Sequence, residues 1–194
     1  MLIEMFGVPT SGKSTLIREI RKFGMVTSGF IDNESIPDKW NCFAKHITET
    51  YDNPTIFNTD KGLGKIKNNT LRALAAAYRG TTYDYPIVFD ELVAQYGMSL
   101  AIRLECEWDW YFNEMPLPGL LVYLTAHRTV LLKRTQNRGK VIKIQKMERC
   151  MDCAPIIIDI LRRRNCQILE LDTGTHNPTA CAQKTIRRIH ILCV

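Results

Sequence analysis

The stretch MFGVPTSGKST, Met5 to Thr15, decides the fold of this chain of 194 residues. Before it, Leu2 to Phe6 form a short, mostly apolar run of the length of a buried parallel strand. After it, apolar residues from Leu16 to Phe23 recur at helical spacing, and Gly24 stands where a helix usually ends. The stretch is therefore predicted to connect a strand to a helix.

This turn matches the phosphate-binding pattern G-x-x-x-x-G-K-[ST] at every fixed position. The glycines allow the main chain to curl so that N–H groups point at an anion, and the following helix adds its positive end. Lys13 is predicted to carry its charge to the outer phosphates of ATP, and Ser14 to hold Mg²⁺. A glycine-rich turn with a capping serine is the alternative. The residues predicted to bind the nucleotide here are Gly7, Pro9, Thr10, Ser11, Gly12, Lys13, Ser14 and Thr15.

Length and composition favour a single domain, residues 1–194, because 45% of the chain is apolar and can form a sizeable core. There is no apolar run of about 18 residues and no signal-peptide pattern, so we expect a soluble, cytoplasmic protein without a membrane partner. For a phage protein this would be the host cytoplasm. The seven cysteines are irregularly spaced, which predicts reduced thiols. The role of the lone CxxC formed by Cys150 and Cys153 and the oligomeric state stay open.

Strand-like and helix-like segments alternate along the rest of the chain. Continuous apolar strands separated by helices predict an α/β P-loop NTPase fold with about five parallel strands. Ligands of such sheets lie at the carboxyl ends of the strands. The further strands are expected at 25–30, 85–92, 119–126 and 167–172. Helices are expected at 39–51 and 61–79, from the third strand to about 104, up to 164, and at the end of the chain.

A second strand end offers two acidic residues. The apolar run Ile87 to Phe89 ends at Asp90, and Glu91 follows directly. Phosphoryl transfer from a nucleotide requires an acidic group beside the phosphate-binding turn to fix Mg²⁺. Asp90 is predicted to fill that role with Ser14, and Glu91 to act as a supporting group or a base. The alternative for Asp90 is a cap on the following helix.

Positive charge is concentrated in the second half of the chain. Residues 98–194 carry 15 Lys and Arg against 9 Asp and Glu, which accounts for the whole formal net charge of +6. The segment at about 128–150 is predicted to form a basic helical lid, with a solvated basic helix as the alternative. Arg134 and Arg138 lie on one helical face and would stabilise the charge of a transferring phosphoryl group. The basic residues of the segment are Arg128, Lys133, Arg134, Arg138, Lys140, Lys143, Lys146 and Arg149.

Four segments together resemble the small P-loop kinases of nucleosides and nucleotides, a group that includes thymidylate kinase. They are GVPTSGKST (7–15), IVFDE (87–91), PLPGLLVYLTAHRTVLLKRTQNRGK (116–140) and LELDTGT (169–175). Only the first is highly specific. The resemblance implies a lid over ATP that carries Arg134 and Arg138, and a loop near the adenine at 173–175.

The chain departs from this group directly after the third strand. The group follows the strand-end acid with an arginine, whereas here Glu91 follows Asp90. A carboxylate would repel an acceptor phosphate at that position, so a neutral hydroxyl acceptor is expected. A hydroxyl acceptor gains from a general base. The candidates for the base are Asp32, Glu34, Asp90 and Glu91, with turn formation as the alternative role of Asp32 and Glu34.

The basic second half and the sequence pI of about 9.0 favour a polyanionic acceptor. Our leading prediction is therefore ATP-dependent transfer to a 5-hydroxymethyl pyrimidine in phage DNA, since the chain is similar to small phage kinases of that kind. Trp108, Trp110, Tyr111 and Phe112 could stack an exposed base, although such clusters more often belong to a core. The first alternative is a kinase of free deoxynucleosides or nucleoside monophosphates. The second is a nucleotide-dependent switch or a DNA-binding ATPase.

Overall fold

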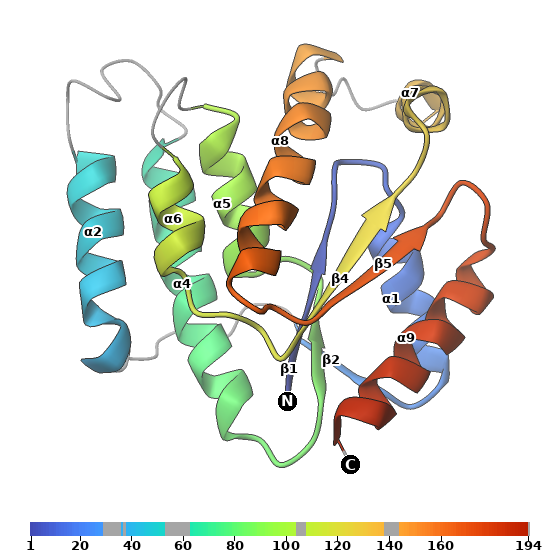
Figure 1. The fold of residues 1–194 in the computed structure, drawn as a ribbon, viewed down its shortest axis with the longest axis horizontal. Coiled ribbons are helices and arrows are strands. Elements are labelled where there is room, and N and C mark those ends of the chain that lie inside the picture. The colour runs from blue at the N-terminus through green and yellow to red at the C-terminus, as the bar shows by residue number, and fades with distance from the viewer. Residues whose placement is uncertain (29–35, 37, 53–62, 104–107, 138–143, 194) are drawn as a thin grey trace.

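The computed structural model describes residues 1–28, 36, 38–52, 63–103, 108–137 and 144–193. Five parallel strands form one sheet in the order β2-β3-β1-β4-β5 (Figure 1). The strands are β1 (Leu2–Phe6), β2 (Val26–Ser28), β3 (Ile87–Phe89), β4 (Leu120–Thr125) and β5 (Ile168–Asp172). Helices cover both faces, so the predicted α/β class with a five-stranded parallel sheet is confirmed.

Strand β1 lies at the centre of the sheet, and all five of its residues are buried. Leu2 pairs with Ile87 of β3, and Ile3 pairs with Leu120 of β4. Because side chains alternate along a strand, Ile3 and Met5 belong to one apolar cluster, and Leu2 and Phe6 belong to the cluster on the opposite face. The strand that enters the phosphate-binding turn is thus held by neighbours on both edges and both faces.

Two layers of helices enclose the sheet (Figure 1). One face is covered by α1 (Lys13–Lys22) and α9 (Pro178–Cys193), which pack on each other and on the strands. The opposite face carries the short helix η1 (Asp38–Trp40) and the α-helices α2 (Asn41–Asp52), α4 (Leu63–Thr82), α5 (Val93–Ala101), α6 (Asp109–Glu114) and α8 (Ile144–Arg163). Helix α7 (Arg128–Asn137) follows β4 at the carboxyl edge of the sheet, beside the loop that leaves β1 (Figure 1).

Strands β2 and β3 are shorter than predicted. The structure gives β2 the range Val26–Ser28, and residues 29 and 30 of the predicted strand lie outside the described residues. β3 covers Ile87–Phe89 rather than 85–92. Pro86 lacks the N–H group that a central strand needs, and after Phe89 the chain turns towards α5. Asp90 and Glu91 therefore lie in the turn after the strand.

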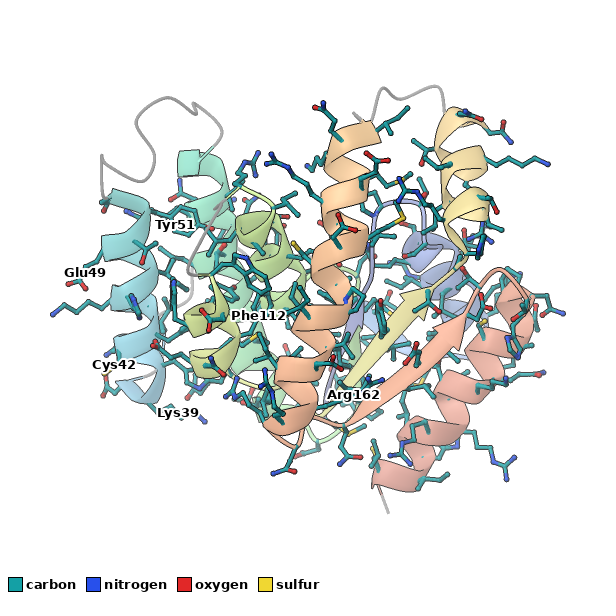
Figure 2. All side chains as sticks on the ribbon, turned by 45° about the horizontal axis from the view of Figure 1, so that its top comes forward. Lys39, Cys42, Glu49, Tyr51, Phe112 and Arg162 are labelled. Atoms are coloured by element: carbon teal, nitrogen blue, oxygen red, sulfur yellow. The ribbon has the colours of Figure 1, made fainter. Side chains whose placement is uncertain are left out.

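The aromatic side chains at 108–112 belong mostly to the core, which corrects their candidate role as a platform for a base. Tyr111 and Phe112 are fully buried, and Tyr111 donates a hydrogen bond of 2.8 Å to the carbonyl of Val93. Trp110 stacks on the His46 ring, with 3.8 Å between ring centroids. Figure 2 shows Phe112 inside the helical layer, whereas Lys39, Cys42 and Glu49 lie on the outer side next to or on α2. The segment also contains α6, a helix that the sequence pattern did not predict.

Gly97 of α5 lets Tyr111 and Phe112 approach the helix, and we expect Gly97→Ala to destabilise the protein. A Cβ at Gly97 would lie 2.4 Å from Cε1 of Tyr111 and 2.7 Å from Cζ of Phe112. Overpacking costs about 1–3 kcal/mol, which exceeds the gain of about 1 kcal/mol from the helix propensity of alanine. Urea unfolding measures the difference in the free energy of unfolding.

The matched control is Gly64→Ala in α4, where a Cβ meets nothing within 4 Å. This variant should be as stable as the native protein or more stable. Equal stabilisation by both substitutions would contradict the packing explanation at Gly97.

None of the helices in the described part of the chain is both long enough and apolar enough to cross a membrane.

Candidate functional site

The loop between β1 and α1 has the backbone shape that its glycines predict. Gly7 has φ 154° and Gly12 has φ 103°, values that side chains rarely tolerate. A Cβ at Gly7 would also lie 2.6 Å from the carbonyl oxygen of Leu124. Thr10 adopts a left-handed conformation as well, with φ 66°. Larger residues at the two glycine positions would therefore change the path of the loop.

The main-chain N–H groups of this loop divide into two sets. The N–H of Gly7 donates to Oε1 of Gln95 at 3.2 Å, and the N–H of Ser11 donates to the carbonyl of Val8 at 3.2 Å. These two N–H groups therefore have partners within the protein. In α1 the N–H of Leu16 makes the first helical bond, to the carbonyl of Gly12 at 2.9 Å. The N–H groups of residues 13–15 precede that bond and are the donors that an anion can use.

Lys13 and Ser14 begin α1 at the mouth of the loop. Nζ of Lys13 donates to the carbonyl of Gly7 at 2.7 Å, so the ammonium group lies across the loop. Oγ of Ser14 lies 3.5 Å from Oδ2 of Asp90, which follows β3. Residues 76 positions apart are thus brought together at the carboxyl edge of the sheet, as expected for ligand sites in such folds.

Magnesium fits the pair formed by Ser14 and Asp90. Oδ1 of Asp90 is buried, and among the described residues no group lies within hydrogen-bonding distance of it. A buried carboxylate oxygen without a partner, beside a serine hydroxyl, suits a cation that prefers oxygen ligands. Asp90 does not cap the following helix, because α5 begins at Val93 and its N-cap residue is Leu92.

The cap of α5 comes instead from Glu4, in the middle of β1. Its carboxylate accepts hydrogen bonds from the N–H of Ala94 at 3.2 Å and of Gln95 at 2.8 Å. Glu4 is 1% exposed. Because Gln95 also accepts the N–H of Gly7, Glu4 helps to position both α5 and the start of the phosphate-binding loop. The sequence pattern missed this network, and the one signal for it was a charged residue inside an otherwise apolar strand.

The buried carboxyl of Glu4 makes stability depend on pH. Burial raises its pKa from 4.5 to about 7, although hydrogen bonds from Gln95, Ala94 and Leu92 lower it. A raised pKa means that the folded protein holds the proton more tightly than the unfolded chain. The stability that Glu4 contributes is therefore complete below pH 4.5 and falls by up to about 1.4 kcal/mol per pH unit until pH 7.

We expect Glu4→Gln to remove this loss, because the amide does not titrate. Between pH 4.5 and 7, the native protein should lose stability relative to the Glu4→Gln variant, as measured by urea unfolding over that range. Glu49→Gln, a change at an exposed residue of α2, is the control, and its stability should depend on pH as that of the native protein does. Parallel profiles of native protein and Glu4→Gln would contradict a raised pKa at Glu4.

A polar cavity of about 230 Å³ opens over the loop. Residues of the phosphate-binding loop line one side of it, and residues of α5 and α8 line the other. Glu91 is exposed and faces this cavity. We call it the polar cavity, and it is lined by Pro9, Thr10, Ser11, Gly12, Lys13, Ser14, Asp90, Glu91, Gln95, Met98, Ser99, Ile102, Lys146 and Cys150. The residues of α5 and α8 that line the polar cavity were not predicted as site residues, because nothing in their spacing marks them. The exception is Lys146, which belongs to the predicted basic segment.

A second cavity of about 350 Å³ lies on the other side of the loop, between α1, α7 and α9. It shares Thr10 and Gly12 with the polar cavity. We call it the side cavity, and it is lined by Thr10, Gly12, Thr15, Leu16, Arg134, Asn137, Thr173, His176, Pro178 and Cys181. The mostly uncharged lining and the position next to the loop after β5 suit a flat ring attached to phosphates in the polar cavity.

Arg134 lies at the boundary of the loop and the side cavity. Its Nη1 donates to Oγ1 of Thr173 at 2.9 Å, and its Nη2 donates to the carbonyl of Thr173 at 2.7 Å. Nη1 also lies 3.5 Å from the carbonyl of Thr10. Thr173 in turn donates to the carbonyl of Ser11 at 2.7 Å. Arg134 therefore joins α7, the loop after β5 and the phosphate-binding loop.

Helix α7 is packed on the phosphate-binding loop through buried polar contacts. Oγ1 of Thr10 donates to the carbonyl of Leu131 at 3.2 Å and lies 3.3 Å from Oγ1 of Thr135. Thr135 also lies 3.0 Å from Sδ of Met147 in α8. Through these contacts, the described part of the predicted lid, 128–137 and 144–150, meets the loop between β1 and α1.

Several predicted residues cannot be placed in this site. Asp32, Glu34 and Arg138 lie outside the described residues. Cys150 is buried and lines the polar cavity, whereas Cys153 is half-buried. Within the described ranges, no group of three or more His, Cys, Asp or Glu side chains could hold a metal ion, so the CxxC is not part of such a cluster there.

No protein-family model and no curated protein sequence matches the chain. Solved structures do match it. Deoxyadenosine kinase from M. mycoides with bound dATP has a TM-score of 0.62 at 14% identity, with 98% of this chain and 100% of that chain covered. Thymidylate kinase from Candida albicans has 0.61 at 16% identity, covering 98% and 91%. Shikimate kinase from Acinetobacter baumannii has 0.51 at 17% identity, covering 98% and 93%. At these identities the likeness establishes that the chain has the fold of these P-loop kinases.

Proposed function

We propose that the chain is an ATP-dependent kinase that transfers the γ-phosphoryl group to a hydroxyl of a nucleoside or nucleotide. The observation that carries this proposal is the loop with Lys13 and the pair Ser14 and Asp90, set between two cavities that share Thr10 and Gly12. The side cavity takes the base of the donor, and the polar cavity takes its phosphates and the acceptor. The fold shared with deoxyadenosine, thymidylate and shikimate kinases supports a phosphotransferase.

In the proposed reaction the acceptor oxygen attacks the γ-phosphorus, the bond from that phosphorus to the β,γ-bridging oxygen breaks, and ADP leaves with the electron pair. Lys13 and the N–H groups at the start of α1 stabilise the negative charge of the phosphates. Ser14 and Asp90 would hold Mg²⁺, which supplies charge neutralisation on the phosphates when it is bound. We propose that Arg134 fixes the donor, a role supported by its contacts with Thr173 and Thr10 beside the side cavity.

Glu91 is the proposed general base for the acceptor hydroxyl. It lines the polar cavity and is exposed, whereas Asp90 is engaged beside Ser14. A carboxylate that takes the proton as the oxygen attacks needs to reach the acceptor, and Glu91 lines the cavity in which we propose that the acceptor lies. The role of Asp32 stays a prediction.

For the acceptor, a nucleoside or nucleotide is favoured by the fold shared with deoxyadenosine kinase and thymidylate kinase. Transfer to a 5-hydroxymethyl pyrimidine in DNA stays a prediction, now without the support of a base platform at Tyr111 and Phe112, which are core residues. The test is incubation with γ-labelled ATP and Mg²⁺, with product identification by mass spectrometry. The acceptors are deoxynucleosides, their 5′-monophosphates, shikimate and an oligonucleotide with 5-hydroxymethyluracil.

Label in a nucleoside or nucleotide supports the proposal. Label only in shikimate contradicts the acceptor class. Release of inorganic phosphate with no labelled acceptor contradicts the kinase and favours the switch or DNA-binding ATPase.

Asp90→Asn should weaken the dependence of the reaction on Mg²⁺, because the amide lacks the charge that holds the cation. We expect the Mg²⁺ concentration for half-maximal rate to rise by about 10- to 100-fold. Asp84→Asn, a change at an exposed residue before β3, is the control and should leave that concentration unchanged. An unchanged Mg²⁺ dependence in Asp90→Asn would remove Asp90 from the cation site.

A further inference from the structure

A third cavity lies between the end of α5 and the start of α8, outside the loop region described above. It has a volume of about 350 Å³, which is within the range of small-molecule sites. Among the described residues, it is lined by Ile102, Arg103, Gln145, Lys146 and Arg149. We call it the basic cavity, because three of these five side chains are positively charged.

The basic cavity adjoins the polar cavity. Ile102 and Lys146 line both cavities. Lys13 also lines the polar cavity. Because the two cavities share Ile102 and Lys146, one molecule of moderate size can reach from Lys13 into the basic cavity.

Arg149 is fixed at the boundary between the two helices. Its Nη1 donates to the carbonyl of Ile102 at 3.2 Å, which ties α8 to the end of α5. A guanidinium group carries five N–H donors, so this bond uses only one. Guanidinium groups match the oxygens of phosphate in geometry as well as in charge. Arg149 is therefore a positioned anion ligand rather than a long side chain that extends into solvent.

Two acids stand near Arg149 in the sequence of α8, Glu148 and Asp152. Glu148 forms an ion pair with Arg128 of α7. Among the described residues that line the basic cavity, three side chains are positively charged and none is negatively charged.

We propose that the basic cavity binds a phosphate group already present on the acceptor. The acceptor is then a phosphorylated nucleoside, and its free hydroxyl reacts in the polar cavity. This inference rests on the proposed function and narrows the acceptor from nucleosides and nucleotides to nucleotides.

This placement also accounts for Glu91 at the position after Asp90. An acceptor phosphate beside Glu91 would be repelled, whereas a hydroxyl there could give up its proton. A phosphate in the basic cavity lies next to Arg103 and Arg149, whereas Glu91 lines the polar cavity. The acceptor thus presents its neutral end to the carboxylate and its anionic end to the arginines.

The test measures binding and transfer separately. The protein is first saturated with a non-hydrolysable ATP analogue and Mg²⁺, so that the donor site is occupied. Calorimetry then compares deoxynucleosides with their 5′-monophosphates, including the 5-hydroxymethyl pyrimidine forms, and with a short oligonucleotide. We expect the 5′-monophosphates to bind at least about tenfold more tightly than the nucleosides, because hydrogen bonds to a charged group contribute enough binding free energy for such a change.

The variants are Arg103→Gln and Arg149→Gln, which remove charge from the basic cavity and keep a polar side chain. Each should weaken binding of phosphorylated acceptors by about 10- to 100-fold and leave binding of nucleosides and of the ATP analogue unchanged. Arg187→Gln, a change at an exposed residue of α9, is the matched control. The melting temperature of each variant is measured with and without the ATP analogue. A variant that has lost only the subsite is still folded and is still stabilised by the analogue.

Equal affinity of native protein for nucleosides and their monophosphates would overturn the inference, whatever the result of the transfer assay. Unchanged discrimination in both arginine variants would also overturn it. If the oligonucleotide binds more tightly than the monophosphates, the phosphate in the basic cavity belongs to a nucleic-acid strand. If the monophosphates bind more tightly, it belongs to a free nucleotide. If the ATP analogue itself does not bind, the proposed function fails, and discrimination measured without it still decides the subsite.

Discussion

Replacing Lys13 by alanine is expected to reduce phosphoryl transfer by about 10³-fold or more. The ammonium group lies 2.7 Å from the carbonyl of Gly7, across the mouth of the loop. Its loss removes a full charge from the position that the outer phosphates of ATP would occupy. The effect should appear in kcat and in the affinity for ATP, and steady-state kinetics with varied ATP measures both.

The matched control is Lys22→Ala at the end of α1, where the lysine is exposed and pairs with Glu19. This variant should keep the native rate. Lys13→Ala should also fold normally, because Lys13 is only half-buried. Native activity in Lys13→Ala would remove the proposed mechanism.

Arg134→Ala is the second substitution with a large expected effect, a loss of about 10³-fold in the rate of transfer. The guanidinium joins the carbonyl of Thr173 to that of Thr10, so its loss loosens both loops around the donor and removes positive charge beside it. We expect Arg134→Lys to recover only part of the activity, because an ammonium group cannot bind both oxygens as a planar fork.

Arg128→Ala on the same helix is the control, since Arg128 is exposed and pairs with Glu148. A merely structural role of Arg134 predicts a lower melting temperature with little change in kcat at saturating ATP. A role at the donor predicts a large drop in kcat even at temperatures well below the melting temperature of the variant. A loss of less than tenfold in Arg134→Ala would contradict a role of this residue at the donor.

The fold could be predicted to a large extent because its signals are local. The apolar run before Gly7 and the helical spacing after Ser14 identify a strand and a helix without reference to the rest of the chain. The strand at 119–126 is similarly clear, and the structure places β4 at Leu120–Thr125. The ends of β3 were predicted less well, because the predicted strand, 85–92, included Pro86 before the strand and the turn after Phe89 that leads to α5.

The candidate site could be predicted only where one motif contains it. The residues of the β1–α1 loop follow from their spacing, and Asp90 follows from its place after a strand. Glu4 and Gln95 could not be found in this way, because their contacts connect positions about 90 apart. The same holds for the basic cavity, which forms only when the end of α5 meets the start of α8. Long-range packing, rather than local pattern, decides these features.

The most direct test of the central claim is calorimetric titration of the native protein and Lys13→Ala with ATP in the presence of Mg²⁺. If the loop from Gly7 to Thr15 binds the triphosphate, the native protein takes up one ATP per chain in a saturable transition. Lys13→Ala should then bind at least about tenfold more weakly. No saturable binding by the native protein, or equal affinity in the variant, would contradict the claim.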